Sequence, residues 1–324
     1  MSISKTIKAP IEKEMRSFEE FFSKRLVSNV AILDIITKYI IRSKGKQLRP
    51  VLVFLSAKLN GEITEKTFIA ATLIELLHTA TLIHDDVVDE TYKRRGFFSV
   101  NSLWRSKIAV LTGDYLLSKG LLIALNAKEI GILEVISAAV KEMSEGELLQ
   151  ISQTRRLDIT ENIYYDIIRK KTATLIAACT KAGAFSVNAS EEYLLKMNQF
   201  GEYLGMAYQI RDDLLDYEKT NLIGKPTGND LKEKKITLPL IYLLNNSTKT
   251  EKQNILKTIQ KHHNNEQKII PIIKKVKESG GIEYTRNVMF SYQNKALEIL
   301  NTYPDNETRT AMQELLYFIT ERNS

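Results

Sequence analysis

Two acidic clusters with the same internal spacing carry the clearest chemical signal in this sequence. The first contains Asp85, Asp86 and Asp89, and the second contains Asp212, Asp213 and Asp216. Residues four apart on a helix project from nearly the same side, so each cluster pairs its first and last carboxylates. The neighbouring residues are largely apolar, which predicts buried turns where close negative charges are costly unless a cation compensates them. Oxygen-only ligands suit magnesium, which keeps positions open for water and phosphate, so two facing carboxylate pairs indicate a diphosphate-metal site.

A solvated acidic helix face is the ordinary alternative for either cluster by itself. Two matching clusters, each in an apolar setting, make that alternative much less favourable. The paired pattern therefore carries more weight than either cluster does alone.

Basic residues flank both clusters, as a diphosphate site requires. The segment 44–50 supplies Lys46 and Arg49 at a predicted helix start, where backbone N–H groups also favour phosphate. Further basic residues beside or between the clusters are Arg94, Arg95, Lys171, Lys225 and Lys235. Each one alone fits a surface charge, but together they exceed what one diphosphate needs, so two diphosphate sites are predicted. His78 lies seven residues before Asp85 on the same helix face and can reach the same cavity, with a core histidine as the alternative.

Helical periodicity dominates the segments that must position these residues. Apolar residues recur at spacings of three and four through 68–82, and Thr64 is the predicted N-cap of that helix, after a turn closed by Gly61. Similar patterns occupy 30–41, 100–125, 132–151, 163–187, 193–217, 238–244, 269–276, 282–300 and 308–319. Convincing alternating strands are absent from the sequence pattern. We therefore predict an all-α fold, a large single-domain antiparallel helix bundle around a central cavity.

Composition favours one globular domain over the whole chain. Of 324 residues, 44% are hydrophobic and 26% are charged, which is ordinary for a globular protein. The 14 Gly and 6 Pro are scattered and mark no linker, so residues 1–324 are expected to form one domain, with 1–29 as an N-terminal helical extension. The net charge of +7 suits anionic substrates or a loose contact with an anionic membrane surface. No nucleic-acid motif accompanies that charge, so nucleic acid is not an expected partner.

Cysteine use and the chain ends bear on the compartment. Cys179 is the only cysteine, so no internal disulfide can form, and its apolar neighbours predict an inert buried thiol. The N-terminus lacks the apolar stretch of a signal peptide, and no apolar run is expected to span a bilayer as a transmembrane segment. We therefore expect a soluble cytoplasmic protein.

Taken together, these motifs resemble the trans-isoprenyl diphosphate synthase family, of the medium- to long-chain polyprenyl type. The matching stretches are 45–50, 82–90, 94–96, 113–114, 145–147, 171–172, 205–216 and 224–239. The resemblance runs from about residue 30 to the C-terminus. It implies an all-α homodimer with a deep cavity in each subunit. The implied reaction joins isopentenyl diphosphate repeatedly, head to tail, to an allylic diphosphate such as farnesyl or geranyl diphosphate.

The resemblance also implies a role for each motif residue. Asp85 and Asp89 match positions that bind two magnesium ions, and Asp212 matches a ligand of a third, supported by Asp213 and Asp216 through water or hydrogen bonds. Arg94 matches a contact to the allylic diphosphate. The isopentenyl diphosphate pocket corresponds to Lys46, Arg49, His78 and Arg95. The groups nearest the reacting carbons correspond to Lys171, Thr172 and Gln209, and the lysines that close over the allylic diphosphate correspond to Lys225 and Lys235.

Product length is expected to depend on the residues just before the first acidic cluster. In the family a bulky aromatic here stops growth early, whereas this chain has Ala80 and Thr81. Small residues leave a tunnel open, so the floor must lie deeper, and Leu121 is one candidate. The other floor candidates are Leu76, Leu77, Leu122 and Ile123. We predict a product of about six to eight isoprene units, set by the depth of the cavity.

Four other interpretations compete with this one. A shorter-chain, geranylgeranyl-type synthase would share every motif. A non-catalytic partner subunit of a heteromeric synthase predicts broken acidic clusters, whereas both are intact here. A terpene cyclase would not need a second diphosphate pocket, and a generic helical scaffold would not explain the paired clusters. One departure from the family pattern is Lys234, where glycine is common.

Overall fold

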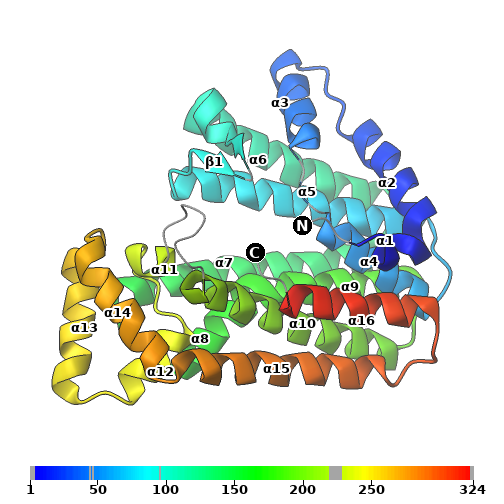
Figure 1. Cartoon of the computed structure of the whole chain (residues 1–324). Helices are drawn as coiled ribbons and strands as arrows, with labels where there is room; N and C mark the ends of the chain where they lie inside the picture. The colour runs from blue at the N-terminus through cyan, green and yellow to red at the C-terminus, as the bar shows by residue number, and fades with distance from the viewer. Residues whose placement is uncertain (1–3, 44, 46, 95, 219–227, 322–324) are drawn as a thin grey trace. The chain divides into compact units, whose positions relative to one another are not determined.

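The computed structural model describes residues 4–43, 45, 47–94, 96–218 and 228–321, with the backbone alone described at Arg94. These residues are almost entirely helical, which confirms the predicted all-α class (Figure 1). The described strands form one short antiparallel hairpin, β1 (Lys93–Arg94) with β2 (Phe97–Phe98), and Lys93 pairs with Phe98. This hairpin follows directly after the first acidic cluster.

The chain divides into two compact units. The first contains Met1–Val140, Ala177–Asn198 and Pro304–Met312, and the second contains Lys141–Ile176, Gln199–Tyr303 and Gln313–Ser324. The division falls within α7 (Ile130–Arg156), α9 (Thr174–Ser186), α10 (Glu191–Glu218) and α16 (Glu307–Thr320). The first acidic cluster belongs to the first unit, and the second cluster belongs to the second unit.

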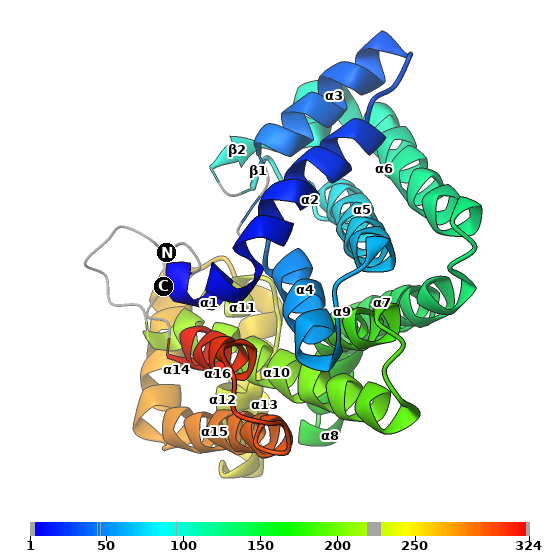
Figure 2. The same ribbon diagram turned by 90° about the vertical axis from the view of Figure 1, so that its right-hand side faces the viewer.

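The first unit is built around two long helices. Its own helices are α1 (Lys5–Lys8), a 3-10 turn (Ala9–Ile11), α2 (Glu12–Arg25), α3 (Ala31–Arg42), α4 (Leu48–Asn60), α5 (Glu65–Val88) and α6 (Val100–Asn126). Helices α5 and α6 lie side by side in both views (Figures 1 and 2). A methyl group at Gly120 of α6 would lie 3.0 Å from Leu73 of α5, so glycine permits this close packing.

The N-terminus of α5 confirms the predicted cap. Thr64 is the N-cap residue, and its side chain and that of Thr67 form a reciprocal capping box. Gly61 ends α4 just before this turn. These local signals set where α5 begins, and its length then places the acidic cluster at its C-terminal end.

In the part of the chain that the structure describes, two helices are long and apolar enough to cross a membrane, judged by length and composition only. They are α5 and α6. In α5, 67% of the apolar window is buried within the protein, which is typical of a core helix, whereas only 33% of the α6 window is buried. The hydropathy of α5 is therefore explained by its central position in the first unit.

The second unit packs the remaining helices around α10 and α12. Its own elements are α8 (Glu161–Ile168), a π-helical turn (Arg169–Ala173), α11 (Asn229–Lys232), α12 (Leu238–Asn245), α13 (Lys249–His262), α14 (Glu266–Glu278) and α15 (Gly281–Leu300). Ile210, Leu214 and Tyr217 of α10 are fully buried in the same apolar cluster as Leu238 and Ile241 of α12. This cluster fixes the C-terminal half of α10, which carries the second acidic cluster.

Candidate active site

The second acidic cluster lies in the last turns of α10, and its carboxylates have different surroundings. Asp212 is exposed, whereas Asp213 and Asp216 are only 6% and 8% exposed. The expectation of a buried turn is therefore right for two of the three residues. Asp212, the predicted metal ligand, keeps the solvent access that a hydrated magnesium ion needs.

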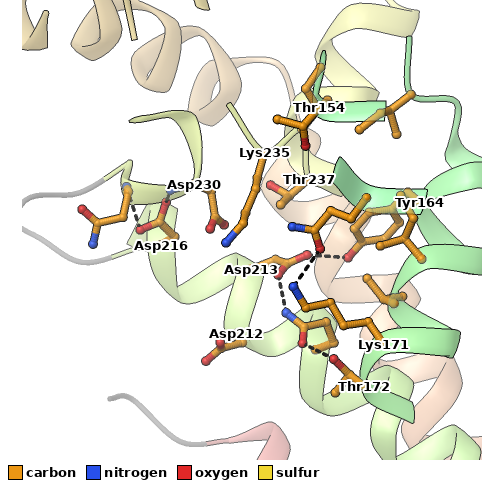
Figure 3. Close-up of a pocket in the computed structure, with 17 residues that line it drawn as sticks. Thr154, Tyr164, Lys171, Thr172, Asp212, Asp213, Asp216, Asp230, Lys235 and Thr237 are labelled. Carbon is orange, nitrogen blue, oxygen red and sulfur yellow. Dashed lines mark hydrogen bonds between the residues drawn. The ribbon is translucent and has the colours of Figure 1, made fainter. Parts of the chain in front are cut away.

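Asp213 is held by two donors from different elements (Figure 3). The hydroxyl of Tyr164 donates to its Oδ2 at 2.7 Å, and Nε2 of Gln209 donates to its Oδ1 at 2.9 Å. The hydroxyl of Thr172 in turn donates to Oε1 of Gln209 at 2.8 Å. The predicted pair of Thr172 and Gln209 is thus in direct contact, and both residues connect to the acidic cluster through Asp213.

Asp216 holds the backbone that follows α10. Its carboxylate accepts the N–H groups of Asn229 at 3.1 Å and Asp230 at 3.0 Å, at the start of α11. Gly228 precedes them with a φ of 82°, in the left-handed region, and a methyl group there would lie 2.5 Å from Ile273. Both oxygens of Asp216 therefore face backbone amides, and its assignment as a metal ligand stays a prediction.

The carboxylates in this region are crowded in a low-dielectric setting. Burial raises the pKa of Asp213 to about 7, against the opposing effects of hydrogen bonds from Tyr164 and Gln209. Burial also raises the pKa of Asp230 to about 8, with the charges of Asp213 and Asp216 adding to the effect. Burial is the first cause of both shifts, so a nearby cation would favour the ionised forms of these carboxylates.

A π-helical turn places Lys171 and Thr172. A methyl group at Gly205 of α10 would lie 2.5 Å from Cα of Ala173, and one at Gly146 of α7 would lie 2.8 Å from the backbone N of Lys171. These glycines let two helices approach the turn closely, because no side chain intervenes. Such turns are frequent at functional sites.

The ammonium group of Lys171 is oriented by α7. It donates to Oε1 of Gln150 at 3.1 Å and forms an ion pair with Glu147. Figure 3 shows Lys171 and Lys235 both reaching toward Asp213. Lys235 follows α11, where its backbone N–H donates to the carbonyl of Asp230 at 2.7 Å. The predicted basic residues Lys171 and Lys235 therefore line the same cavity as the second acidic cluster.

This cavity has a volume of about 320 Å³ and lies within the second unit. It brings together six residues of the predicted site: Lys171, Thr172, Gln209, Asp212, Asp216 and Lys235. Lining residues that the sequence analysis missed include Gln150, Thr154, Tyr164, Asp230 and Thr237. Tyr164 lies seven residues before Lys171, a spacing that places two residues on the same face of a helix, and this spacing could have indicated that Tyr164 belongs to the site. Apolar walls come from Ile159, Ile167, Ile168 and Ile236.

The first acidic cluster ends α5 in the first unit. Asp89 is the C-cap residue and is exposed, Asp85 is half-buried, and Asp86 is buried. The expected burial therefore holds only for Asp86, because the helix ends at Val88 and its last turn meets solvent. Asp85 and Asp89 keep the accessibility that ligands of a hydrated ion need.

The predicted residues of the isopentenyl diphosphate pocket are only partly described. Arg49 lies half-buried in the first turn of α4, after Gln47 in a left-handed conformation. His78 is buried and lines a cavity of about 90 Å³ with Gln47, Glu75 and Asp86. Lys46, Arg95 and Lys225 lie outside the described residues, and so does the side chain of Arg94. Their predicted roles are not tested by the structure.

The residues expected to set product length lie on α5 and α6. Ala80 is buried, whereas Thr81 is half-buried and its hydroxyl donates to the carbonyl of His78 at 2.9 Å. Leu121 is half-buried on α6. Leu122, another candidate for the floor, is 55% exposed, and its role stays a prediction. Cys179 is fully buried, and burial raises its pKa to about 12, as expected for an inert thiol.

Comparison with known proteins identifies the family. A family model described as polyprenyl synthetase matches residues 30–276. The chain belongs to this family. It is 32% identical over 312 residues to the octaprenyl diphosphate synthase of Escherichia coli, covering 96% of each chain. The structure matches the crystal structure of a decaprenyl diphosphate synthase from Rhodobacter capsulatus with a TM-score of 0.92 and 32% identity, covering 98% of each chain.

A geranylgeranyl pyrophosphate synthase from Bacteroides thetaiotaomicron matches with a TM-score of 0.83 and 38% identity, again over 98% of each chain. The protein is therefore a prenyl diphosphate synthase of the trans type, a transferase of prenyl groups. Polyprenyl synthetases use magnesium in catalysis, with isopentenyl diphosphate and an allylic diphosphate as substrates. The resemblance inferred from the motifs is thus confirmed.

Proposed function

We propose that this enzyme adds isopentenyl diphosphate repeatedly to farnesyl or geranyl diphosphate, giving a polyprenyl diphosphate of about six to eight isoprene units. The observation that carries this proposal is the cavity of the second unit, where Lys171, Thr172 and Gln209 meet Asp212 and Lys235. Lysine ammonium groups, aspartate carboxylates and the neutral oxygens of Thr172 and Gln209 all line this cavity. This combination suits the departure of a diphosphate and the stabilisation of the cation that it leaves.

Each side chain of the cavity has a defined part in the proposal. Lys171 and Lys235 attract the diphosphate and stabilise its growing charge as the allylic C–O bond breaks. The oxygens of Thr172 and Gln209 stabilise the allylic cation without capturing it. Isoleucines of the wall exclude water, which would quench the cation to an alcohol. The released diphosphate can take the proton, so no side-chain general base is required.

Magnesium fits the carboxylates that the structure leaves accessible. Asp85 and Asp89 would hold two ions, and Asp212 would hold a third, with Asp216 as the further ligand predicted from the motif. Across the described ranges, no three His, Cys, Asp or Glu side chains form a ready-made metal site. This is what is expected of ions that complete their shells with water and diphosphate. When bound, magnesium neutralises the charge that develops on the leaving diphosphate.

The isopentenyl diphosphate pocket is proposed from Lys46, Arg49, His78 and Arg95, and the allylic diphosphate contacts from Arg94, Lys225 and Lys235. We also propose that residues 1–324 act as one domain in which both acidic clusters serve the same reaction. Ala80, Thr81 and Leu121 are proposed to limit the product length. These assignments rest on the motif match.

A homodimer is the proposed assembly. Leu111, Leu122 and Leu125 are all exposed on α6, and their spacing places them within one stripe of the helix that follows the kink at Arg105. An exposed apolar stripe of this kind is typical of a subunit interface. A cytoplasmic location, with a loose membrane contact for product release, is proposed with it.

Two alternatives are separated from this proposal by one experiment. Purified protein would be incubated with magnesium, farnesyl diphosphate and labelled isopentenyl diphosphate, and the products resolved by chromatography. Products of about six to eight units support the proposal, whereas products that stop near four units favour a geranylgeranyl-type enzyme. No incorporation by folded protein, with several starters tried, favours the partner-subunit alternative. Chelation of the metal is the control, since turnover must then stop.

A further inference from the structure

Tyr164 is a buried residue whose position beside the acidic cluster calls for an explanation. It is 3% exposed and lies on α8, one turn before the π-helical turn that carries Lys171 and Thr172. Its hydroxyl donates to Asp213 at 2.7 Å. Tyr164 lines the cavity of the second unit, but the proposed reaction gives it no role.

The hydrogen bonds that start at Tyr164 have only one direction. Asp213 accepts both of its hydrogen bonds, one on each side-chain oxygen, so each partner presents a proton. Gln209 therefore turns its amide nitrogen to Asp213 at 2.9 Å, and its carbonyl oxygen necessarily points the other way. That oxygen needs a donor, which is the hydroxyl of Thr172 at 2.8 Å.

This direction decides what Thr172 offers to the cavity. The single proton of its hydroxyl is used on Gln209, so the side chain presents oxygen lone pairs elsewhere. A reversed chain would turn the hydroxyl proton toward the cavity. Lone pairs stabilise an adjacent cation, whereas a proton directed at it is repelled.

We propose that Tyr164 is a positioning residue: it holds Asp213 where the other side-chain oxygen meets the amide nitrogen of Gln209, and the chain Tyr164–Asp213–Gln209–Thr172 then leaves Thr172 facing the allylic cation as an acceptor. This inference rests on the roles proposed above for Thr172 and Gln209. Tyr164 itself touches neither substrate nor metal in this scheme. It acts by occupying one oxygen of Asp213, which leaves the other oxygen for the amide of Gln209.

A matched pair of variants tests the first step. Tyr164→Phe removes the hydroxyl that bonds Asp213, and Tyr165→Phe removes the adjacent hydroxyl, which instead donates to Glu161 at 2.8 Å. We expect kcat to fall about tenfold in Tyr164→Phe with both KM values within about twofold, because a bond to a charged group is lost without loss of substrate contacts. Tyr165→Phe should keep kcat within about twofold of the parent. Equal kcat values for the two variants would overturn the inference.

Coupling to Thr172 tests the chain itself. In a Thr172→Val background no hydroxyl remains to be oriented, so adding Tyr164→Phe should lower kcat by less than about twofold more. In a Thr172→Ser background the hydroxyl is retained, so adding Tyr164→Phe should again lower kcat about tenfold. A full further loss in the valine background would overturn the inference, because the two residues would then act independently.

The same variants separate a failure of this inference from a failure of the proposed function. If Thr172→Val itself leaves kcat unchanged, the role proposed for Thr172 is wrong, and the inference falls with it. If Thr172→Val lowers kcat but Tyr164→Phe does not, only the positioning role of Tyr164 is overturned. Melting temperatures of every variant, measured with magnesium present, establish that the folded enzymes are compared.

Asp213→Asn gives a second measurement should Tyr164→Phe fail to fold. The amide has nearly the shape of the carboxylate but offers a donor on one side, which favours reversal of Gln209. We expect kcat to fall at least about tenfold. Parent-like kcat would overturn the inference. A shift in the magnesium requirement alone would also overturn it, because Asp213 would then act through the metal.

Discussion

Asp216 accepts the backbone N–H of Asp230 at 3.0 Å, across fourteen positions of sequence. The same carboxylate accepts the N–H of Asn229 at 3.1 Å. The Asp216 carboxylate therefore caps the N-terminus of α11, as the side chain of an N-cap residue does in a longer helix. The third aspartate of the second cluster thus anchors the segment that leads to Lys235.

Asp216→Ala is expected to loosen that segment before it affects the rest of the fold. Two backbone N–H groups lose a charged acceptor, which should destabilise the local structure by about 2 kcal/mol. Hydrogen exchange at Asn229 and Asp230 should become faster, while amides of α12 stay protected. Asp213→Ala is the matched control, since Asp213 bonds no backbone group of α11 in the described structure. Unchanged exchange at Asn229 would contradict the anchoring role.

Asp85→Ala and Asp212→Ala should each abolish condensation and leave the helical fold intact. Both carboxylates have solvent access, so their removal leaves no buried cavity, but it removes proposed magnesium ligands. Turnover of labelled isopentenyl diphosphate and circular dichroism measure the two effects. Glu134→Ala, at an exposed position of α7, is the control for loss of a surface charge. Near-normal turnover in either aspartate variant would refute the metal assignment.

Ala80→Phe should shorten the products. Ala80 is 2% exposed on α5, five residues before Asp85, and a phenyl ring there would fill the space in which a growing chain is proposed to extend. Chromatography of the products shows the effect directly, and Ala31→Phe at an exposed position of α3 is the control. An unchanged range of product lengths would mean that the chain does not pass Ala80.

Lys234→Gly should stabilise the enzyme by about 1 kcal/mol. Lys234 has a φ of 58°, in the left-handed region that a side chain disfavours. This conformation also explains why glycine is common here in the family. Urea unfolding measures the change, and Lys261→Gly within α13 should have the opposite sign. A loss of stability in Lys234→Gly would show that the side chain of Lys234 makes a compensating contact.

Glu218→Gln should weaken the second unit at neutral pH but not in acid. Burial alone raises the pKa of Glu218, but hydrogen bonds and charges from Arg286 and Arg211, each at 2.8 Å, outweigh it and hold the pKa below its usual value. A depressed folded pKa contributes stability above the unfolded value of about 4.3, and this contribution is lost as pH falls through the folded pKa.

The difference between the parent and Glu218→Gln in urea unfolding should therefore be largest near pH 7 and shrink progressively below about pH 4. Glu283→Gln, which removes an exposed partner of the same Arg286, should show a much smaller difference at neutral pH. A difference that is constant with pH would mean that the charge of Glu218 does not contribute.

Much of the candidate site could be predicted because its residues occur in short sequence patterns with regular spacing. Carboxylates four apart, a lysine followed by a threonine, and a threonine cap before α5 are short-range patterns, and the helix period places them without knowledge of the fold. The helical class followed from the same period. Asp85 and Asp212 were therefore predicted as metal ligands from residue type and spacing, whereas the role predicted for Lys171 came from the family resemblance.

Burial and hydrogen-bond direction were decided only by the tertiary structure. The sequence pattern treats the three aspartates of a cluster alike, but Asp213 is buried against α8 and Asp216 against the start of α11, whereas Asp212 stays exposed. Tyr164 and Asp230 join the site from other elements, with partners 49 and 14 positions away in sequence. No helical period extends over such separations, because these contacts exist only after the apolar core has brought α8, α10 and α11 together.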